Sequence, residues 1–411
     1  MSVLRSPRRT AALRKGALAT FAGVGACILM GASPFSDRTW IDKPPWEWNE
    51  KRRKPHPSKA DPRARQVYAP VFIKKIAEQD RGAQSVLDAV TQGGAWNRRE
   101  LAGPAFDPGT GLVLVGTSDR SFYGISGRTG EVVWRVPLQG RVSSTPVVDN
   151  ENVLFGADDG GIYGLRKGTG YQVFRYQSDS EVTAPLAVSG DAIFAHTAQD
   201  TVVALRRNTG EWMWQTRHPL PAGISLLGES APAAGTVLRP GDTPLSAVFV
   251  GHADGQVSAM DATDGRVLWT TPIGKGDDFL DVDADLRYDA GTLYVAAFHG
   301  GAHAMDPLSG ATLWTSDVDG INRMALTAHT LVVAGPGQVV SLNRADGKVR
   351  WRFKFPSGGA STPVVHRGRV LVSTDRGALY VLAFMDGRPL QYYGGKPGFT
   401  AAPAVHDDAL F

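Results

Sequence analysis

The sequence predicts an all-β propeller built from four-stranded blades. From Leu101 onward, a turn dipeptide ending in glycine recurs, with an aromatic residue four positions after the glycine in most copies. These glycines stand at 130, 170, 210, 265, 310, 347 and 387, so their spacings are 40, 40, 55, 45, 37 and 40 residues. A period near 40 residues made of strand-like segments is typical of propellers.

Each repeat contains four short segments with the composition of strands. The first often carries a proline such as Pro146, which cannot donate to a central sheet ladder. The second is an apolar run such as Leu112–Val115, and the third alternates, as in Phe122–Ile125. The fourth, for example Val132–Arg135, follows the glycine turn. Asx and Gly turns between such runs are hairpin signals, so each repeat predicts one antiparallel blade.

The number of strands predicts eight blades. Seven full units end near residues 138, 178, 218, 273, 318, 355 and 395. Residues 399–411 supply two further strands, and the β-branched segment 67–76 is a candidate for a third. We therefore expect a single propeller domain over residues 67–411, with an eighth blade closed by pairing of N- and C-terminal strands. Closure of this kind removes exposed strand edges.

The recurring tryptophan is interpreted as a packing residue. Its regular place in most units favours one large aromatic per blade that locks neighbouring blades together. A ligand-binding role would require a local cluster rather than an even distribution around the ring. The residues concerned are Trp134, Trp214, Trp269, Trp314 and Trp351.

Residues 1–36 are interpreted as a signal peptide or membrane anchor. Five basic residues between Arg5 and Lys15 precede an uncharged stretch from Gly16 to Ser36, which is the pattern of an export segment. Cys27 follows Val24, Gly25 and Ala26, as in a bacterial lipobox. We predict lipidation of Cys27 and removal of residues 1–26, which would tether the protein to a membrane through a lipid.

An uncleaved anchor in the inner membrane is the alternative, since 21 uncharged residues suffice to cross a bilayer. Residues 37–66 are rich in Pro, Lys and Arg and form the predicted tether, in which the basic run 51–54 can lie on anionic lipid head groups.

Charge is divided unevenly along the chain. Residues 1–75 hold 16 Lys and Arg against 5 Asp and Glu, whereas the remainder holds 28 against 35. The propeller itself is therefore mildly acidic, which argues against a nucleic-acid-binding body. Cys27 is the single cysteine, so neither an intramolecular disulfide nor a cysteine-based zinc site can form.

Two segments are more specific than the repeat itself. The repeat resembles that of pyrroloquinoline-quinone-type propellers, and residues 224–232 (ISLLGESAP) and 280–283 (LDVD) resemble signature segments of the BamB family. This resemblance implies a non-catalytic periplasmic scaffold of the outer-membrane β-barrel assembly machinery, held by a lipid. Its implied partners are the POTRA domains of BamA, other assembly components and unfolded outer-membrane proteins. The residues implied in partner binding are Ile224, Leu226, Glu229, Asp281 and Asp283. Leu227 stands where the family usually has arginine.

The alternative is a quinone-binding propeller, either an oxidoreductase or a sensor. Resemblance to the quinone-dependent dehydrogenases would imply calcium ligands and a ring of adjacent cysteines, which Cys27 alone cannot form. The acidic stretch 277–285 also departs from a calcium loop, because counting from Asp281 places Leu286 at the glycine position and Thr292 at the glutamate position. His299 and His303 are predicted to be surface residues. We therefore expect no catalytic residues, no cofactor and no metal site.

Overall fold

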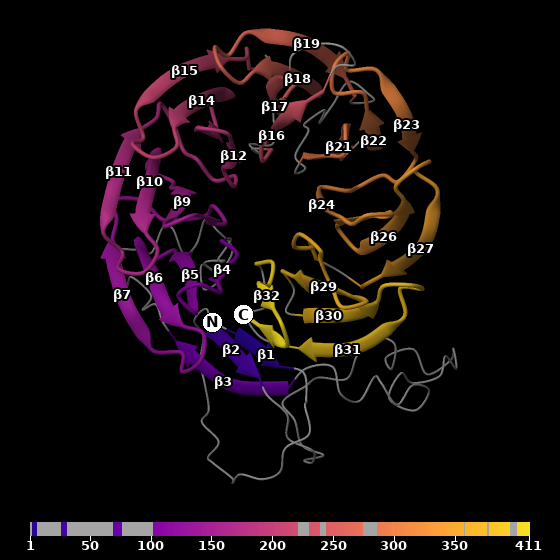
Figure 1. The fold of residues 1–411 in the computed structure, drawn as a ribbon. Coiled ribbons are helices and arrows are strands. Elements are labelled where there is room, and N and C mark those ends of the chain that lie inside the picture. The colour runs from indigo at the N-terminus through magenta and orange to yellow at the C-terminus, as the bar shows by residue number, and fades with distance from the viewer. Residues whose placement is uncertain are drawn as a thin grey trace, which may run out of the picture.

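The structure is a computed structural model, and it forms a closed ring of β-sheets (Figure 1). It describes residues 102–220, 230–238, 244–273, 286–298, 300–356, 358–375, 378–394 and 401–411, together with the backbone of 2–5, 26–30 and 69–75. Every regular element in these residues is a strand. Within the same ranges, no helix has the length and apolar character needed to cross a membrane.

The first four blades each contain four strands in sequence order. Blade 1 comprises β4 (Ala105–Asp107), β5 (Leu112–Thr117), β6 (Ser121–Ser126) and β7 (Val132–Pro137). Blade 2 comprises β8 (Val147–Asp149), β9 (Asn152–Gly156), β10 (Gly161–Arg166) and β11 (Gln172–Gln177). Blade 3 comprises β12 (Ala187–Ser189), β13 (Ala192–His196), β14 (Thr201–Arg206) and β15 (Trp212–Arg217). Blade 4 comprises β16 (Ala233–Val237), β17 (Leu245–Gly251), β18 (Gln256–Asp261) and β19 (Val267–Pro272).

Three further blades follow the same pattern. Blade 5 comprises β20 (Arg287–Asp289), β21 (Thr292–Ala297), β22 (Gly301–Met305) and β23 (Thr312–Ser316). Blade 6 comprises β24 (Arg323–Leu326), β25 (Thr330–Gly335), β26 (Gln338–Asn343) and β27 (Val349–Lys354). Blade 7 comprises β28 (Val364–His366), β29 (Arg369–Thr374), β30 (Ala378–Ala383) and β31 (Pro389–Gly394).

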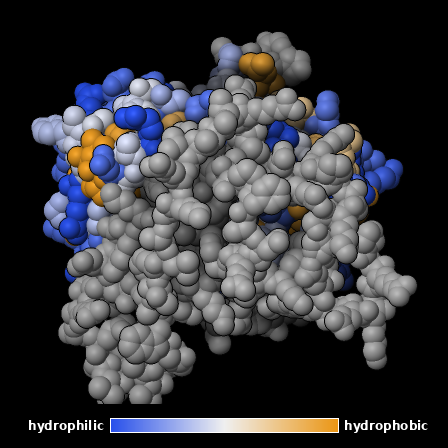
Figure 2. All heavy atoms as spheres, turned by 90° about the horizontal axis from the view of Figure 1, so that it is seen from below, coloured by the Kyte–Doolittle hydropathy of each residue, from blue (hydrophilic) through white to orange (hydrophobic). Residues whose placement is uncertain are grey.

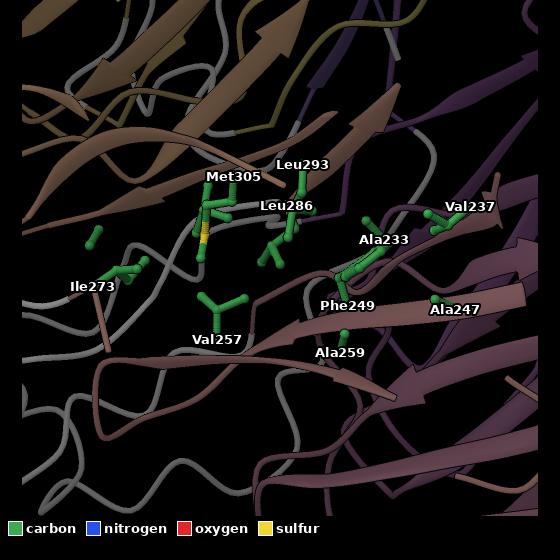
Figure 3. Packing of buried hydrophobic residues seen from close by; sticks show 12 residues of the cluster. Ala233, Val237, Ala247, Phe249, Val257, Ala259, Ile273, Leu286, Leu293 and Met305 are labelled. Atoms are coloured by element: carbon green, nitrogen blue, oxygen red, sulfur yellow. The ribbon is translucent and has the colours of Figure 1, made fainter. Parts of the chain in front are cut away.

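The core lies between the blades. The middle strands are covered on both faces, as in β9, where every residue is buried, whereas the outer strand β11 buries mainly Phe174. Figure 3 shows one such layer, in which Phe249 and Val257 of blade 4 lie in one cluster with Leu293 and Met305 of blade 5. Because each face packs against a neighbouring blade, stability depends on the contacts between blades.

The tryptophans join neighbouring blades, as predicted. Trp134 of blade 1 donates its indole N–H to the carbonyl of Lys167 in blade 2 at 3.2 Å. Its ring lies against Gly170, where a Cβ would approach the ring to 2.6 Å. Trp214, Trp269, Trp314 and Trp351 make the same contacts with the next blade. The glycine of the recurring turn is therefore required for both its left-handed φ and its closeness to the indole.

The prediction of eight four-stranded blades is wrong in number. The described residues form seven such blades, and between blades 7 and 1 lies a five-stranded closing sheet of order β2-β3-β1-β33-β32 (Figure 1). Its N-terminal strands are β1 (Ser2–Arg5), β2 (Ala26–Met30) and β3 (Ala69–Lys75), and its C-terminal strands are β32 (Val405–His406) and β33 (Ala409–Leu410). The sequence predicts only β3 among the N-terminal strands, because residues 1–36 have the composition of an export segment.

The two ends of the chain do pair, as predicted. In β1, Leu4 lies opposite Leu410 of β33, and Arg5 lies opposite Ala409. Strand β3 pairs with β1 and β2 rather than directly with the C-terminal strands. On the other side, Phe411 stacks on Phe106 of blade 1, with ring centroids 4.7 Å apart.

Candidate functional site

Two turns and two long connections of blades 3 and 4 belong to one face of the ring. In a blade of four antiparallel strands, successive connections alternate between the two faces. The turn after the second strand and the connection leaving the fourth strand therefore share a face. The turns 197–200 in blade 3 and 252–255 in blade 4, and the connections that leave β15 and β19, belong to this face.

The sequence-predicted site residues are not described. Ile224, Leu226 and Glu229 fall in the connection between β15 and β16, and Asp281 and Asp283 fall in the connection between β19 and β20; all five lie outside the described residues. Cys27 is placed in β2 as backbone only. Partner binding by these five residues and lipidation of Cys27 therefore stay predictions.

A buried polar cluster lies on this face between blades 3 and 4, and its members are His196, Asp200 and His252. One carboxylate oxygen of Asp200, Oδ1, lies 2.8 Å from His196 Nε2 and 2.7 Å from His252 Nδ1. The other oxygen, Oδ2, accepts the backbone N–H of Ala253 at 3.3 Å. All three side chains are at most 3% exposed. Among the described residues, this is the one group of three histidine, cysteine or acidic side chains whose ligand atoms converge.

The surroundings hold the two imidazoles in place. His196 Nδ1 lies 3.2 Å from the carbonyl of Ser230, which can only accept, so that nitrogen carries a proton. The ring of His252 stacks on that of His218, with centroids 3.9 Å apart, and His218 is held by Asp254 at 2.8 Å. His252 Nε2 is buried and has no hydrogen-bond partner in the described structure.

Burial and hydrogen bonding shift the pKa values of Asp200 and His252 in opposite directions. Burial alone would raise the pKa of Asp200, but the hydrogen bonds from His196 and His252 outweigh it and hold that pKa below its ordinary value. Burial lowers the pKa of His252, and this exceeds the opposing effect of the Asp200 carboxylate. Asp200 is therefore an ionised buried carboxylate, and His252 favours its neutral form.

Sequence reasoning missed this cluster, although the repeats carry a signal for it. His196 ends the second strand where blades 2 and 4 have Gly156 and Gly251, and Asp200 stands in the following turn where they have Gly160 and Gly255. Asp200 keeps the left-handed backbone of those turn glycines, with φ of 55°. A comparison of the blades position by position would have singled out both substitutions.

The other histidines and the exposed apolar side chains considered as possible sites do not form one in the described residues. His303 is buried rather than on the surface as expected, and its ring contacts Gly300 O and Thr315 Oγ1 at 3.0 and 3.3 Å; His299 lies outside the described residues. Trp212 and Leu313 are 56% and 58% exposed on outer strands. On the face shown in Figure 2, the described surface is mostly hydrophilic with isolated apolar patches. Single exposed apolar side chains of this kind are normal and indicate no site.

A family model and several curated proteins that match this chain carry the same description. The family described as outer membrane protein assembly factor BamB matches residues 82–294, 162–331 and 299–396. Curated proteins of that name are 25% identical over 190 residues in Legionella pneumophila, 26% over 196 in Escherichia coli and 31% over 172 in Xanthomonas campestris. These matches cover 44%, 46% and 40% of this chain and 50%, 48% and 42% of the relatives, so the chain matches about half the length of each.

Solved structures share the fold. BamB from Moraxella catarrhalis aligns with a TM-score of 0.64 at 20% identity, covering 76% of this chain and 95% of that one. A quinohemoprotein alcohol dehydrogenase from Comamonas testosteroni aligns with a TM-score of 0.60 at 14% identity, covering 75% of this chain and 69% of that one. At these identities the likeness concerns the propeller and not its chemistry.

Proposed function

The chain belongs to the BamB family of outer membrane protein assembly factors, and on that premise we propose that it is a non-catalytic scaffold for assembling β-barrel proteins in the outer membrane. The observation that carries this proposal is the family match, which extends from residue 82 to residue 396 and so includes all seven four-stranded blades. A rigid ring with variable connections on one face suits a binding platform, since loops on a fixed scaffold commonly carry recognition.

The proposed partner is the POTRA region of BamA, with further assembly components and unfolded outer-membrane proteins as other candidates. The contact residues are Ile224, Leu226, Glu229, Asp281 and Asp283. Apolar side chains would form the buried centre of the contact, and the acids would pair with basic groups at its rim. The strands that precede the two segments, β15 and β19, end on the same face of neighbouring blades, which suits a single partner domain that contacts both.

The described residues at the end of the first segment support this assignment. Ser230 is buried, and its hydroxyl bridges the backbone of Gly251 in blade 4 by donating to the carbonyl at 2.9 Å and accepting the N–H at 3.0 Å. Its own carbonyl faces His196 in blade 3. The segment of predicted contact residues therefore ends on a point fixed to two blades, which reduces the ordering cost of binding.

We propose a periplasmic location on the outer membrane, with the lipid on Cys27 as the anchor and residues 37–66 as the tether. A single lipid anchors only marginally, so the basic run 51–54 would supply the second membrane contact. The proposed function requires no cofactor. The likeness to the quinohemoprotein dehydrogenase concerns the fold alone, so it adds no support for the quinone-binding alternative.

The test uses two double variants and a POTRA fragment of BamA. Ile224→Ala with Leu226→Ala should weaken binding at every salt concentration, because the apolar centre sets the dissociation rate. Asp281→Ala with Asp283→Ala should weaken it most at low salt, because rim charges act mainly on association. Val133→Ala with Leu313→Ala is the matched control, since both residues are exposed on outer strands. Circular dichroism establishes that each variant is folded. Folded variants of both kinds that bind like the parent would refute this contact surface.

A further inference from the structure

We propose that His196, Asp200 and His252 form a binding site for a divalent transition-metal ion such as Zn²⁺, which joins blades 3 and 4. The ligand atoms would be His196 Nε2, Asp200 Oδ1 and His252 Nδ1, which lie within 4.8 Å of one another. The site is independent of the proposed scaffold function and differs from the metal-free protein expected from the sequence.

The donor accounting of His196 points to a cation at this position. The Ser230 carbonyl requires a proton on Nδ1, so a neutral His196 presents the lone pair of Nε2 to the Asp200 carboxylate at 2.8 Å. Two acceptors at that separation need a positive charge between them. A second proton on His196, which makes it an imidazolium that donates to Asp200, supplies this charge, and so does a metal ion, which would also use the Nδ1 lone pair of His252.

The remaining polar atoms of His196 and Asp200 make the hydrogen bonds that are usual for metal ligands. A ligating histidine usually donates its other N–H to a carbonyl or carboxylate, and a ligating carboxylate is itself hydrogen-bonded. His196 has the Ser230 carbonyl in this role, and Asp200 Oδ2 has the Ala253 N–H. The stacked ring of His218, held by Asp254, fixes the plane of His252.

Burial makes compensation of the Asp200 charge necessary. A buried carboxylate is costly unless it is paired. In the described part of the chain, its ion-pair partners are the two histidines, and His252 has its other nitrogen buried and unpartnered. A divalent ion would neutralise the carboxylate and use the ring nitrogen of His252 that already faces it.

Asp200 has a left-handed backbone conformation, which is favourable for glycine and costly for other residues. The equivalent turns of blades 2 and 4 have glycine at this left-handed position, and Asp200 adopts it with φ of 55°. Asp tolerates this region better than most residues, yet at a cost compared with glycine. Arg120 has the same backbone in the equivalent turn of blade 1, with φ of 60°, so this conformation accommodates the site without marking it.

The donor set selects the class of metal. Two imidazole nitrogens and one carboxylate suit Zn²⁺ and its first-row neighbours, whereas Ca²⁺ and Mg²⁺ prefer all-oxygen sites. A tetrahedral zinc centre needs ligand atoms about 3.4 Å apart. Binding would therefore lengthen each distance from a nitrogen to Asp200 Oδ1, now 2.8 and 2.7 Å, by less than about 1 Å. It would also draw together ligand atoms that now lie up to 4.8 Å apart, and metal bonds would replace the two contacts.

The experiment uses tag-free full-length protein dialysed against a chelator. Titration with Zn²⁺ in a calorimeter should give a stoichiometry near one, and Co²⁺ should produce the visible absorption bands of a four- or five-coordinate centre. The melting temperature should rise with Zn²⁺, because the ion binds the folded ring and not the unfolded chain.

Asp200→Asn and His252→Gln should each weaken Zn²⁺ binding by more than about tenfold and abolish the Co²⁺ bands. His329→Gln, an exposed histidine in blade 6, is the matched control and should bind like the parent. If Asp200→Asn does not fold, His252→Gln and the Co²⁺ spectrum of the parent decide the question. Absence of stoichiometric binding by the parent would overturn the proposal, as would unchanged binding by folded His252→Gln. Either outcome would leave the scaffold function untouched.

Discussion

At the scale of single residues, the tryptophans link each blade to the next one. Trp214 is 5% exposed, donates to the carbonyl of Ala262 at 3.0 Å and covers Gly265 of the next blade. Removing its side chain would open a cavity between blades 3 and 4. Because each blade is supported by its neighbours, a local loss of this kind weakens the whole ring.

We predict that Trp214→Ala lowers the free energy of unfolding by about 3–5 kcal/mol. Trp212→Ala is the matched control two residues away: its side chain is 56% exposed, and its effect should stay within about 0.5 kcal/mol. Denaturant unfolding of both variants gives the comparison. A Trp214→Ala protein that unfolds like the parent yet fails to bind the POTRA fragment would show that the indole is a contact residue.

The sequence predicts the role of the tryptophans but not the contact between Asp200 and His252. The role of the tryptophans follows from their even spacing, which the sequence displays directly. The contact of Asp200 with His252 joins residues 52 positions apart in two blades, and no local spacing encodes it. His196 and Asp200 visibly replace a strand-end glycine and a turn glycine of blades 2 and 4, but the meaning of these replacements depends on which side chain of blade 4 lies opposite.

At the scale of elements, the strands of the seven blades could be predicted because turn chemistry and apolar runs recur together. The closing sheet could be predicted only in part. Pairing of the two chain ends follows from the need to cover strand edges. Strands β1 and β2 could not be foreseen, since a basic and apolar N-terminus has the composition of an export signal, whatever backbone pairing it also makes.

Removal of an N-terminal signal would change which strands close the ring. We predict that the mature protein lacks residues 1–26 and carries a diacylglycerol group on Cys27. Strand β1 would then be absent, and β2 would begin next to the lipidated residue. Intact mass of protein purified from membranes measures both changes. An unprocessed Met1 or Ser2 terminus would instead establish the uncleaved anchor, with β1 retained beside β33.

At the scale of the whole molecule, the ring is a scaffold whose blades share one architecture and whose connections differ. Trp indoles and inter-blade ion pairs such as Lys167 with Asp107, at 3.0 Å, hold the blades together. The longest connections between units leave blades 3 and 4 on one face, the face on which the His196–Asp200–His252 cluster also joins these blades. This division agrees with the proposal that the connections bind the partner while the sheets hold them in place.

The most direct test of this account is recovery of BamA with the intact, membrane-tethered protein. After mild solubilisation of the membranes in which the protein is produced, affinity purification should yield BamA in near-stoichiometric amount. The Ile224→Ala, Leu226→Ala double variant should yield much less, although it is folded and equally abundant in the membrane. Purification of the folded, tethered parent without BamA would contradict the scaffold function proposed for this chain.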